Sequence, residues 1–323
     1  MFMTMLIMSV ILSVSSNSWF SAWMGMEMNL MMLMPMILEK NNLTTKESAM
    51  TYFMVQAIAS MLLMLSIVLM MNKMNNDIKN MMTMSTLMMK SGVAPFHFWL
   101  PKMMEGLSWM NCLIMMTIQK IAPMILMSNL MNINMITIMA MMMSVMIGGI
   151  GGMNQTSLRK LMSYSSISNN GWMMAAMMSS EMTWILYFVM YSIMMMVMTM
   201  SMNMNKIFYM NQLMSMNKST NKKFFMLLNM LSISGLPPMM GFLPKWVTIH
   251  SVMNYNQIML MITMIMMTLI TIYYYLRIMY SAMMLSNSEM NWNFKMTMNK
   301  SMMTLNTVSI VSMTMMTSLM TLY

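Results

Sequence analysis

The chain has 323 residues, of which 59% are hydrophobic and only 7% charged, with a net charge of +10. A soluble domain carries charge on about 25% of its residues, so these charges are too few to coat a globular surface. The positive charges lie in short segments between long apolar runs, a pattern that excludes a nucleic-acid-binding role. We therefore predict a chain whose solvent is lipid.

Methionine accounts for 77 residues. Its flexible side chain fills irregular gaps and replaces Leu or Ile against lipid or in a core. A copper-binding cluster is the alternative, but the methionines are spread along the whole chain with no local grouping of His or Cys. We interpret them as apolar filler. Reading of AUA codons as Met, as in animal mitochondrial codes, would produce this enrichment, and the coding DNA would show it.

Metal, haem and hydrolase chemistry find little support in the sequence. The lone Cys112 excludes an internal disulfide and a Cys-based zinc or iron–sulfur site. His97 and His250 are too few for a metal cage, and a haem would need both on facing helices at one depth. No Ser/His/Asp set, paired carboxylates or CxxC unit is present. We expect no metal or cofactor bound by this chain.

About eleven apolar runs of ~20 residues, the length that a bilayer core requires, follow one another along the chain. They cover residues 2–20, 23–38, 50–71, 80–101, 107–131, 133–153, 160–178, 183–203, 223–248, 256–283 and 301–322. The polar stretches Asn203–Lys223 and Ser286–Lys300 separate some of them, and the first is expected to include a short surface helix. The sequence therefore predicts an all-α polytopic membrane protein with a single transmembrane domain over residues 1–323.

Basic residues are distributed unequally between the two sets of loops. The side that includes the N-terminus collects Lys40, Lys46, Lys102, Arg159, Lys160, Lys206, Lys218, Lys222, Lys223, Lys295 and Lys300, and the other side holds Lys73 and Lys79. The positive-inside bias places the N-terminus on the matrix or cytoplasmic face, and an odd span count places the C-terminus opposite. Residues 1–14 lack a basic region and a cleavage site, so no cleavable signal peptide is expected.

Two of the predicted spans are interrupted by helix-breaking residues. The fourth contains SGVAP at 91–95, and the ninth contains SGLPP at 234–238, followed by Gly241 and Pro244. Freed backbone groups survive in a membrane only where they are buried in protein or line a wet cavity. About five spans separate the breaks, so the broken helices run in opposite directions, as in two inverted five-helix repeats. We predict repeats over 2–131 and 133–283 and a final span over 301–322; kinks that merely help packing are the alternative.

Four charged residues fall inside apolar runs: Glu27, Lys90, Lys120 and Lys245. Each would cost about 2.5–3.5 kcal/mol if it faced lipid at mid-membrane, so they are expected to face one another or internal water. Burial weakens the hold of a lysine on its proton and a nearby carboxylate strengthens it, so such a group exchanges protons when its surroundings change. Arginine stays protonated and suits this task less well. The four residues are therefore candidates for a proton relay.

Structural alternatives remain for several of these features. Lys245 lies near a predicted helix end, from which its amine would reach the interface. Glu27 would also serve a purely structural ion pair. Arg277 is interpreted as an interfacial anchor. The glycine run 148–152 is interpreted as a site of close helix packing, because no strand precedes it as a phosphate loop requires.

The segments around these residues are WMGMEMN (23–29), KSGVAPFHFWLP (90–101), QKIAP (119–123), GGMNQTSLRK (151–160) with YSSI (164–167), and GLPPMMGFLPKW (235–246). Taken together they resemble the subunit 2 family of mitochondrial NADH:ubiquinone oxidoreductase (respiratory complex I), antiporter-like subunits of its membrane arm. The resemblance covers nearly the whole chain. It implies a form shortened at the N-terminus to about eleven spans, in agreement with the hydropathy.

The resemblance implies that the four charged residues correspond to the proton-pathway residues of the family. Glu27 would be the switching carboxylate, Lys90 its partner, Lys120 the central relay and Lys245 the exit-side relay. The chain would carry protons from the matrix to the intermembrane space across the mitochondrial inner membrane. NADH oxidation and ubiquinone reduction, with NAD, FMN, iron–sulfur clusters and ubiquinone, would belong to other subunits. Implied partners are other membrane-arm subunits, especially antiporter-like subunit 4 and the small subunit 4L, and phospholipids such as cardiolipin.

The chain departs from the family pattern in two places. The acid that usually follows the FHFWxP proline is replaced by Lys102, and Glu105 comes a little later. The His that usually follows the Ser-Ser-Ile segment is replaced by Asn169, followed by Asn170. Because Asn does not titrate, a proton-carrying role at this position would require a bridging water.

Two other functions compete with the proton-pumping interpretation. The first is a sodium/proton antiporter core subunit, which would build sodium-dependent pH gradients in vesicles. The second is a membrane scaffold that moves nothing, for which neutral replacements at Glu27, Lys90 and Lys120 would leave the proton yield intact.

Overall fold

A computed structural model describes residues 1–38, 42–71, 76–214, 220–237, 239–253, 255 and 257–284. Within them the regular structure is helical, and the one isolated bridge joins Ser157 to Tyr209. The chain divides into two compact units, Met1–Ser144 (unit 1) and Val145–Tyr323 (unit 2). The predicted span 301–322 lies outside the described residues.

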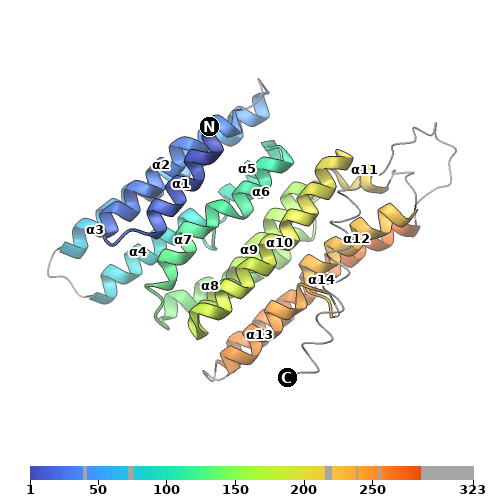
Figure 1. The fold of residues 1–323 in the computed structure, drawn as a ribbon. Coiled ribbons are helices and arrows are strands. Elements are labelled where there is room, and N and C mark those ends of the chain that lie inside the picture. The colour runs from blue at the N-terminus through green and yellow to red at the C-terminus, as the bar shows by residue number, and fades with distance from the viewer. Residues whose placement is uncertain are drawn as a thin grey trace. The chain divides into compact units, whose positions relative to one another are not determined.

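Unit 1 is a bundle of long and short helices (Figure 1). The helices are α1 (Phe2–Val14), α2 (Trp19–Ile37), α3 (Leu43–Met71), α4 (Asn76–Ser91), α5 (Trp99–Gly106), α6 (Trp109–Met116), α7 (Ile118–Ser128) and the first part of α8 (Met135–Gly152). Helix α2 packs against α1 and α3, α3 against α4 and α5, and α7 against α1, α4 and α6. At Gly25 a side chain would begin 2.8 Å from the Ser13 backbone nitrogen, so glycine permits the close approach of α2 to α1.

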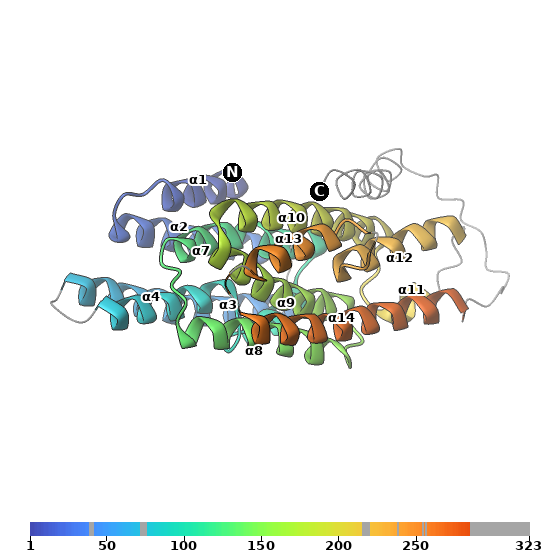
Figure 2. The same cartoon turned by 90° about the horizontal axis from the view of Figure 1, so that it is seen from below.

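Unit 2 is built around one central helix. Its helices after α8 are α9 (Leu158–Ser179), α10 (Glu181–Asn205), α11 (Met210–Met214), α12 (Thr220–Ser234), α13 (Phe242–Met253) and α14 (Ile258–Met284). Helix α9 packs against α10, α13 and α14, and Figure 2 shows it with α10 and α13 on one side and α14 on the other. Helix α11 lies in the polar stretch where a short helix was predicted.

The central position of α9 explains its polar sequence. Its residues are buried almost continuously from Leu158 to Met177. The hydroxyls of Ser163, Ser165 and Ser166 each donate to the carbonyl three residues earlier, at 2.6, 2.8 and 2.8 Å. Such hydroxyls are satisfied within their own helix, so protein can enclose them without water. Helix α9 therefore faces protein rather than lipid.

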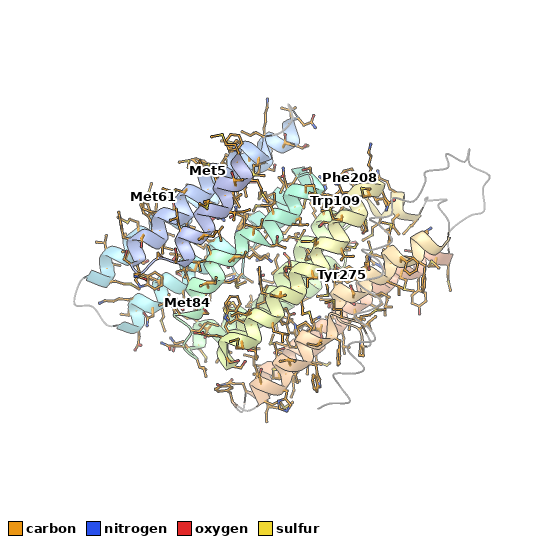
Figure 3. All side chains as sticks on the ribbon, viewed as in Figure 1. Met5, Met61, Met84, Trp109, Phe208 and Tyr275 are labelled. Carbon is orange, nitrogen blue, oxygen red and sulfur yellow. The ribbon has the colours of Figure 1, made fainter. Side chains whose placement is uncertain are left out.

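Methionine serves both as a surface and as a core residue. Met61 on α3 is 74% exposed, whereas Met84 on α4 is 3% exposed. Figure 3 shows thioether side chains along the helices of both units rather than gathered at one place. This distribution agrees with the use of Met as a general apolar filler.

The helices follow the predicted apolar runs, but only some of them are both long and apolar enough to cross a bilayer. Each predicted run up to residue 283 overlaps one helix or two consecutive helices. Among the described residues, five segments are long and apolar enough to cross a bilayer: α3, α6 with α7, α8, α10 and α14. Helix α1, with 13 residues, is shorter than the ~20 that a bilayer core needs. The count of about eleven spans and the inverted repeats stay predictions.

One interruption was not foreseen. The run 107–131 was expected to be continuous, yet the structure divides it into α6 and α7 at Thr117, where φ is −119° and ψ is −76°. The Thr117 hydroxyl donates to the Leu113 carbonyl at 2.7 Å and so satisfies one end of α6. The nearest proline, Pro123, lies inside α7 rather than at the break.

Candidate functional site

The first predicted break is present in unit 1. Helix α4 ends at Ser91, and Gly92 follows with a φ of +73°, a conformation that side chains disfavour. The Val93 amide then donates to the Met88 carbonyl at 3.0 Å, which closes the end of the helix. The left-handed conformation of Gly92 therefore ends α4 before the chain reaches Pro95.

Side chains satisfy the carbonyls that the break leaves open. The Gln56 amide on α3 donates to the Lys90 carbonyl at 3.3 Å, and the Trp99 indole donates to the Met89 carbonyl at 3.2 Å. Both donors are buried. The end of α4 is thereby held in protein without exposing polar backbone to lipid, as a membrane requires.

Lys90 occupies the last turn of α4 and is 8% exposed. The half-buried Glu27 carboxylate on α2 is close enough to interact electrostatically with both the Lys90 amine and the buried Tyr52 hydroxyl. Tyr52 also packs against Trp99, with ring centroids 6.0 Å apart. The structure thus brings together an acid, a lysine and a phenol beside a broken helix.

Lys120 is buried near the beginning of α7, with 2% of its surface exposed. Helix α7 packs against α4, the helix that carries Lys90. Its neighbour Gln119 pairs with Asn29 on α2: each amide donates to the other at 2.9 Å. Glu27, Lys90 and Lys120 therefore belong to three helices of unit 1 that are connected by direct packing or hydrogen bonds.

The second predicted break is present in unit 2, and a lysine completes it. Helix α12 ends at Ser234, and Gly235 follows with a φ of +82°. Lys245, from the first turns of α13, is 7% exposed and donates from Nζ to the Ser234 carbonyl at 2.6 Å. Its amine is therefore directed into the break rather than toward the surface.

The turn that leads into α13 approaches the last turn of α12 very closely. A side chain at Gly241 would overlap the Ser232 carbonyl oxygen and lie 3.1 Å from the Met194 sulfur. Only glycine allows the chain that enters α13 to pass so near to the last turn of α12. This approach is what brings Lys245 within reach of Ser234.

Buried tyrosines meet the polar face of α9. The Tyr187 hydroxyl on α10 donates to the Asn169 Oδ1 at 3.0 Å. One turn further along α10, Tyr191 forms a hydrogen bond with Ser166. Asn169, which replaces the histidine of the family pattern, is thus held by a tyrosine.

A third tyrosine reaches α9 from α14. Tyr275 forms a hydrogen bond with Ser165, and its hydroxyl lies 3.6 Å from the Met162 sulfur. Helix α13, which carries Lys245, packs against α9, α10 and α14, the helices that supply these hydroxyls.

The other residues singled out in the sequence occupy ordinary positions. His97 is buried with Nδ1 3.2 Å from the Pro95 carbonyl oxygen, and Cys112 is buried beside the Met104 carbonyl. Lys102 is exposed, and Glu105 is half-buried. Arg277 is exposed and donates to the Met153 carbonyl. Within the part of the chain that the structure describes, no group of three or more His, Cys, Asp or Glu could hold a metal ion.

Several participants escaped the sequence reasoning. Asn29, Gln56, Gln119 and Tyr52 lie beside the charged residues of unit 1, but none is charged. In the sequence each of them is a polar residue within an apolar run. That pattern does not distinguish an amide or phenol buried in protein from one that contacts water. Only the pairing across distant segments distinguishes them.

We expect alanine substitutions at the two glycines with positive φ to destabilise the protein by different amounts. Gly92→Ala and Gly235→Ala should each cost about 1–2 kcal/mol of left-handed strain. In Gly235→Ala the new methyl would also lie 2.9 Å from the Lys245 Nζ and displace it from Ser234, whereas at Gly92 it meets the flexible end of Leu100 at 2.8 Å. Thermal unfolding in detergent should therefore show a larger fall in midpoint for Gly235→Ala; equal falls would contradict a role for Lys245 in closing α12.

Comparison with known proteins gives consistent matches along most of the chain. A family model described as NADH:quinone oxidoreductase/Mrp antiporter, TM, matches residues 16–272. The NADH-ubiquinone oxidoreductase chain 2 of Locusta migratoria is 42% identical over 318 residues, covering 97% of this chain and 93% of its own. That of Aedes aegypti is 45% identical over 299 residues, covering 90% and 87%. That of Lemur catta is 36% identical over 315 residues, covering 91% and 90%.

Solved structures share the fold at lower identity. A chain of respiratory complex I from Thermus thermophilus with bound Aureothin has a TM-score of 0.85 and 17% identity, covering 98% of this chain and 77% of that one. A chain of the Mrp complex from Dietzia sp. DQ12-45-1b has a TM-score of 0.79 and 14% identity, covering 87% and 59%.

Proposed function

The chain belongs to the NADH:quinone oxidoreductase/Mrp antiporter family and, within it, to the NADH-ubiquinone oxidoreductase chain 2 proteins, and on that premise we propose that it translocates protons within complex I. It acts without a redox centre of its own, because NADH oxidation and ubiquinone reduction take place in other subunits. Protons move from the matrix to the intermembrane space, with the N-terminus on the matrix side. Its partners are other membrane-arm subunits, especially antiporter-like subunit 4 and the small subunit 4L, and phospholipids such as cardiolipin.

The observation that carries this proposal is the buried acid–base group of unit 1. Lys90 and Lys120 are 8% and 2% exposed, and Glu27 interacts with Lys90 beside the broken end of α4. Buried lysines are energetically costly in a membrane protein, so their presence indicates a functional site. The protonation of such a lysine responds to a nearby carboxylate. Glu27 acts as the switching carboxylate, Lys90 as its partner and Lys120 as the central relay.

Lys245 has the role of exit-side relay in unit 2. Its amine donates a hydrogen bond to the Ser234 carbonyl at a helix break. The helices packed around α13 supply the hydroxyls of Tyr187, Tyr191 and Tyr275. Unwound backbone that lines a polar interior is typical of ion and proton sites in transporters. This polar surrounding supports the assignment.

Substitution of Lys90 tests the proposal directly. In the complex that contains Lys90→Met, we expect normal assembly and a lower proton yield per NADH oxidised, because the methionine matches the side-chain length but carries no proton. The exposed Lys46 on α3 provides the control, and Lys46→Met should leave the yield unchanged. Proton uptake by inner-membrane vesicles, measured with a pH dye against NADH consumption, gives the ratio.

The same vesicles separate the competing functions. An unchanged proton yield in Lys90→Met would overturn the relay and favour a scaffold. A pH gradient that depends on sodium rather than on NADH oxidation would instead indicate a sodium/proton antiporter.

A further inference from the structure

Asn29 on α2 and Gln119 on α7 form a cross-helix pair of side-chain amides between the two helices that carry Glu27 and Lys120. The Asn29 Nδ2 donates to the Gln119 Oε1 and the Gln119 Nε2 donates to the Asn29 Oδ1, both at 2.9 Å. Asn29 is 5% exposed and Gln119 is half-buried. Each amide thus satisfies the other across a sequence separation of 90 residues.

The pair determines how α2 and α7 align along their axes. Glu27 precedes Asn29 by two residues, or about 3 Å of helix axis, and Lys120 follows Gln119 by one residue, or about 1.5 Å. The charged residues therefore lie within one helical turn of the pair. A slide of one residue would separate both donors from their acceptors, because N–H···O hydrogen bonds span only about 2.7–3.2 Å.

Packing links α2 to α7 through their common neighbour α1. Helix α2 packs chiefly against α1 and α3, whereas α7 packs chiefly against α1, α4 and α6. A second polar bridge from the same strip of chain, Asn111 Nδ2 to the Met36 carbonyl at 2.9 Å, belongs to α6. The interruption at Thr117 separates α6 from α7, so the Asn111 bridge positions α6, whereas the Asn29–Gln119 pair bonds α2 directly to α7.

From this geometry we propose that the Asn29–Gln119 pair is a positioning element of the relay, which aligns α2 with α7 and so sets the separation of Glu27 from Lys120 and Lys90. The inference rests on the proposed function of these charges. Two neutral amides suit the task, because they specify one alignment, as buried polar pairs do elsewhere, without holding a proton themselves.

The test compares variants of the assembled complex in membrane vesicles. Gln119→Leu, and the double variant Asn29→Leu with Gln119→Leu, remove the pair; the double variant leaves no amide unsatisfied. We expect the proton yield per NADH to fall by about twofold or more, because residues that share one hydrogen-bond network are energetically coupled. Assembly and NADH:ubiquinone turnover should be unchanged. The exchanged variant, Asn29→Gln with Gln119→Asn, keeps the combined length and should restore the yield.

Asn111→Leu is the matched control, because it removes a buried amide between α2 and α6 but not the link to α7. A full proton yield in the double leucine variant, an equal loss in Asn111→Leu, or no recovery in the exchanged variant would overturn the positioning role. Lys120→Met separates this result from the proposed function. A lower yield in Lys120→Met with full yield in the double leucine variant overturns positioning alone, whereas full yield in both overturns the relay itself.

Discussion

Lys120→Met is expected to remove most of the proton translocation that this subunit contributes, while the complex still assembles. Lys120 is 2% exposed and lies on α7, which packs against the helix of Lys90 and is bonded to the helix of Glu27. Methionine has a similar length and is common in the surrounding core, so packing is preserved while the titratable amine is lost. The measurement is proton yield per NADH in vesicles, normalised to assembled complex.

Lys120→Arg distinguishes a relay from a fixed charge. The guanidinium keeps its positive charge but does not release its proton, so this variant should also lose translocation. A normal yield in Lys120→Arg would show that only a charge is needed at this position. The exposed Lys102 on α5 provides the control, and Lys102→Met should leave the yield unchanged.

Gly241→Ala is expected to cause the largest structural defect. Its methyl would overlap the Ser232 carbonyl oxygen, and this obstacle is backbone, which cannot rotate away as a side chain can. Relief requires the turn before α13 to move away from the end of α12, which would also pull the Lys245 amine from the Ser234 carbonyl. Overpacking of this kind costs about 1–3 kcal/mol.

The amount of assembled complex on native gels and its thermal inactivation midpoint should both fall in Gly241→Ala. Met240→Ala provides the control at the adjacent residue, because it removes atoms from a half-buried side chain and adds none. Normal stability of Gly241→Ala would show that the two half-helices separate without cost, and the close approach would then not be required.

The helix breaks show where sequence reasoning succeeds. Helix α4 ends at Ser91 and α12 at Ser234, each directly before a glycine in the left-handed region, as the SGVAP and SGLPP segments predicted. These signals are local, because glycine and proline alter the backbone where they stand. The break at Thr117 was missed because no glycine accompanies it and its nearest proline lies within α7.

The predicted run 160–178 coincides with helix α9, but hydropathy did not reveal that protein encloses this helix. Helix α9 carries Ser163, Ser165, Ser166 and Asn169, yet it is the central helix of unit 2 and almost wholly buried. Neighbouring helices enclose these groups, so their polarity carries little cost there. A long, uniformly apolar run predicts a helix in contact with lipid. A helix surrounded by protein can carry polar residues and so lack such a run.

The sequence by itself determined that lipid is the solvent, where the two helices break, and which four charges are out of place in apolar surroundings. These properties follow from composition and from the conformational limits of single residues. Tertiary structure decided which groups meet: Glu27 with Lys90, Lys245 with the Ser234 carbonyl, and Asn29 with Gln119. The last pair joins residues 90 positions apart. Such encounters depend on how whole helices pack, and no local rule of propensity or periodicity contains that information.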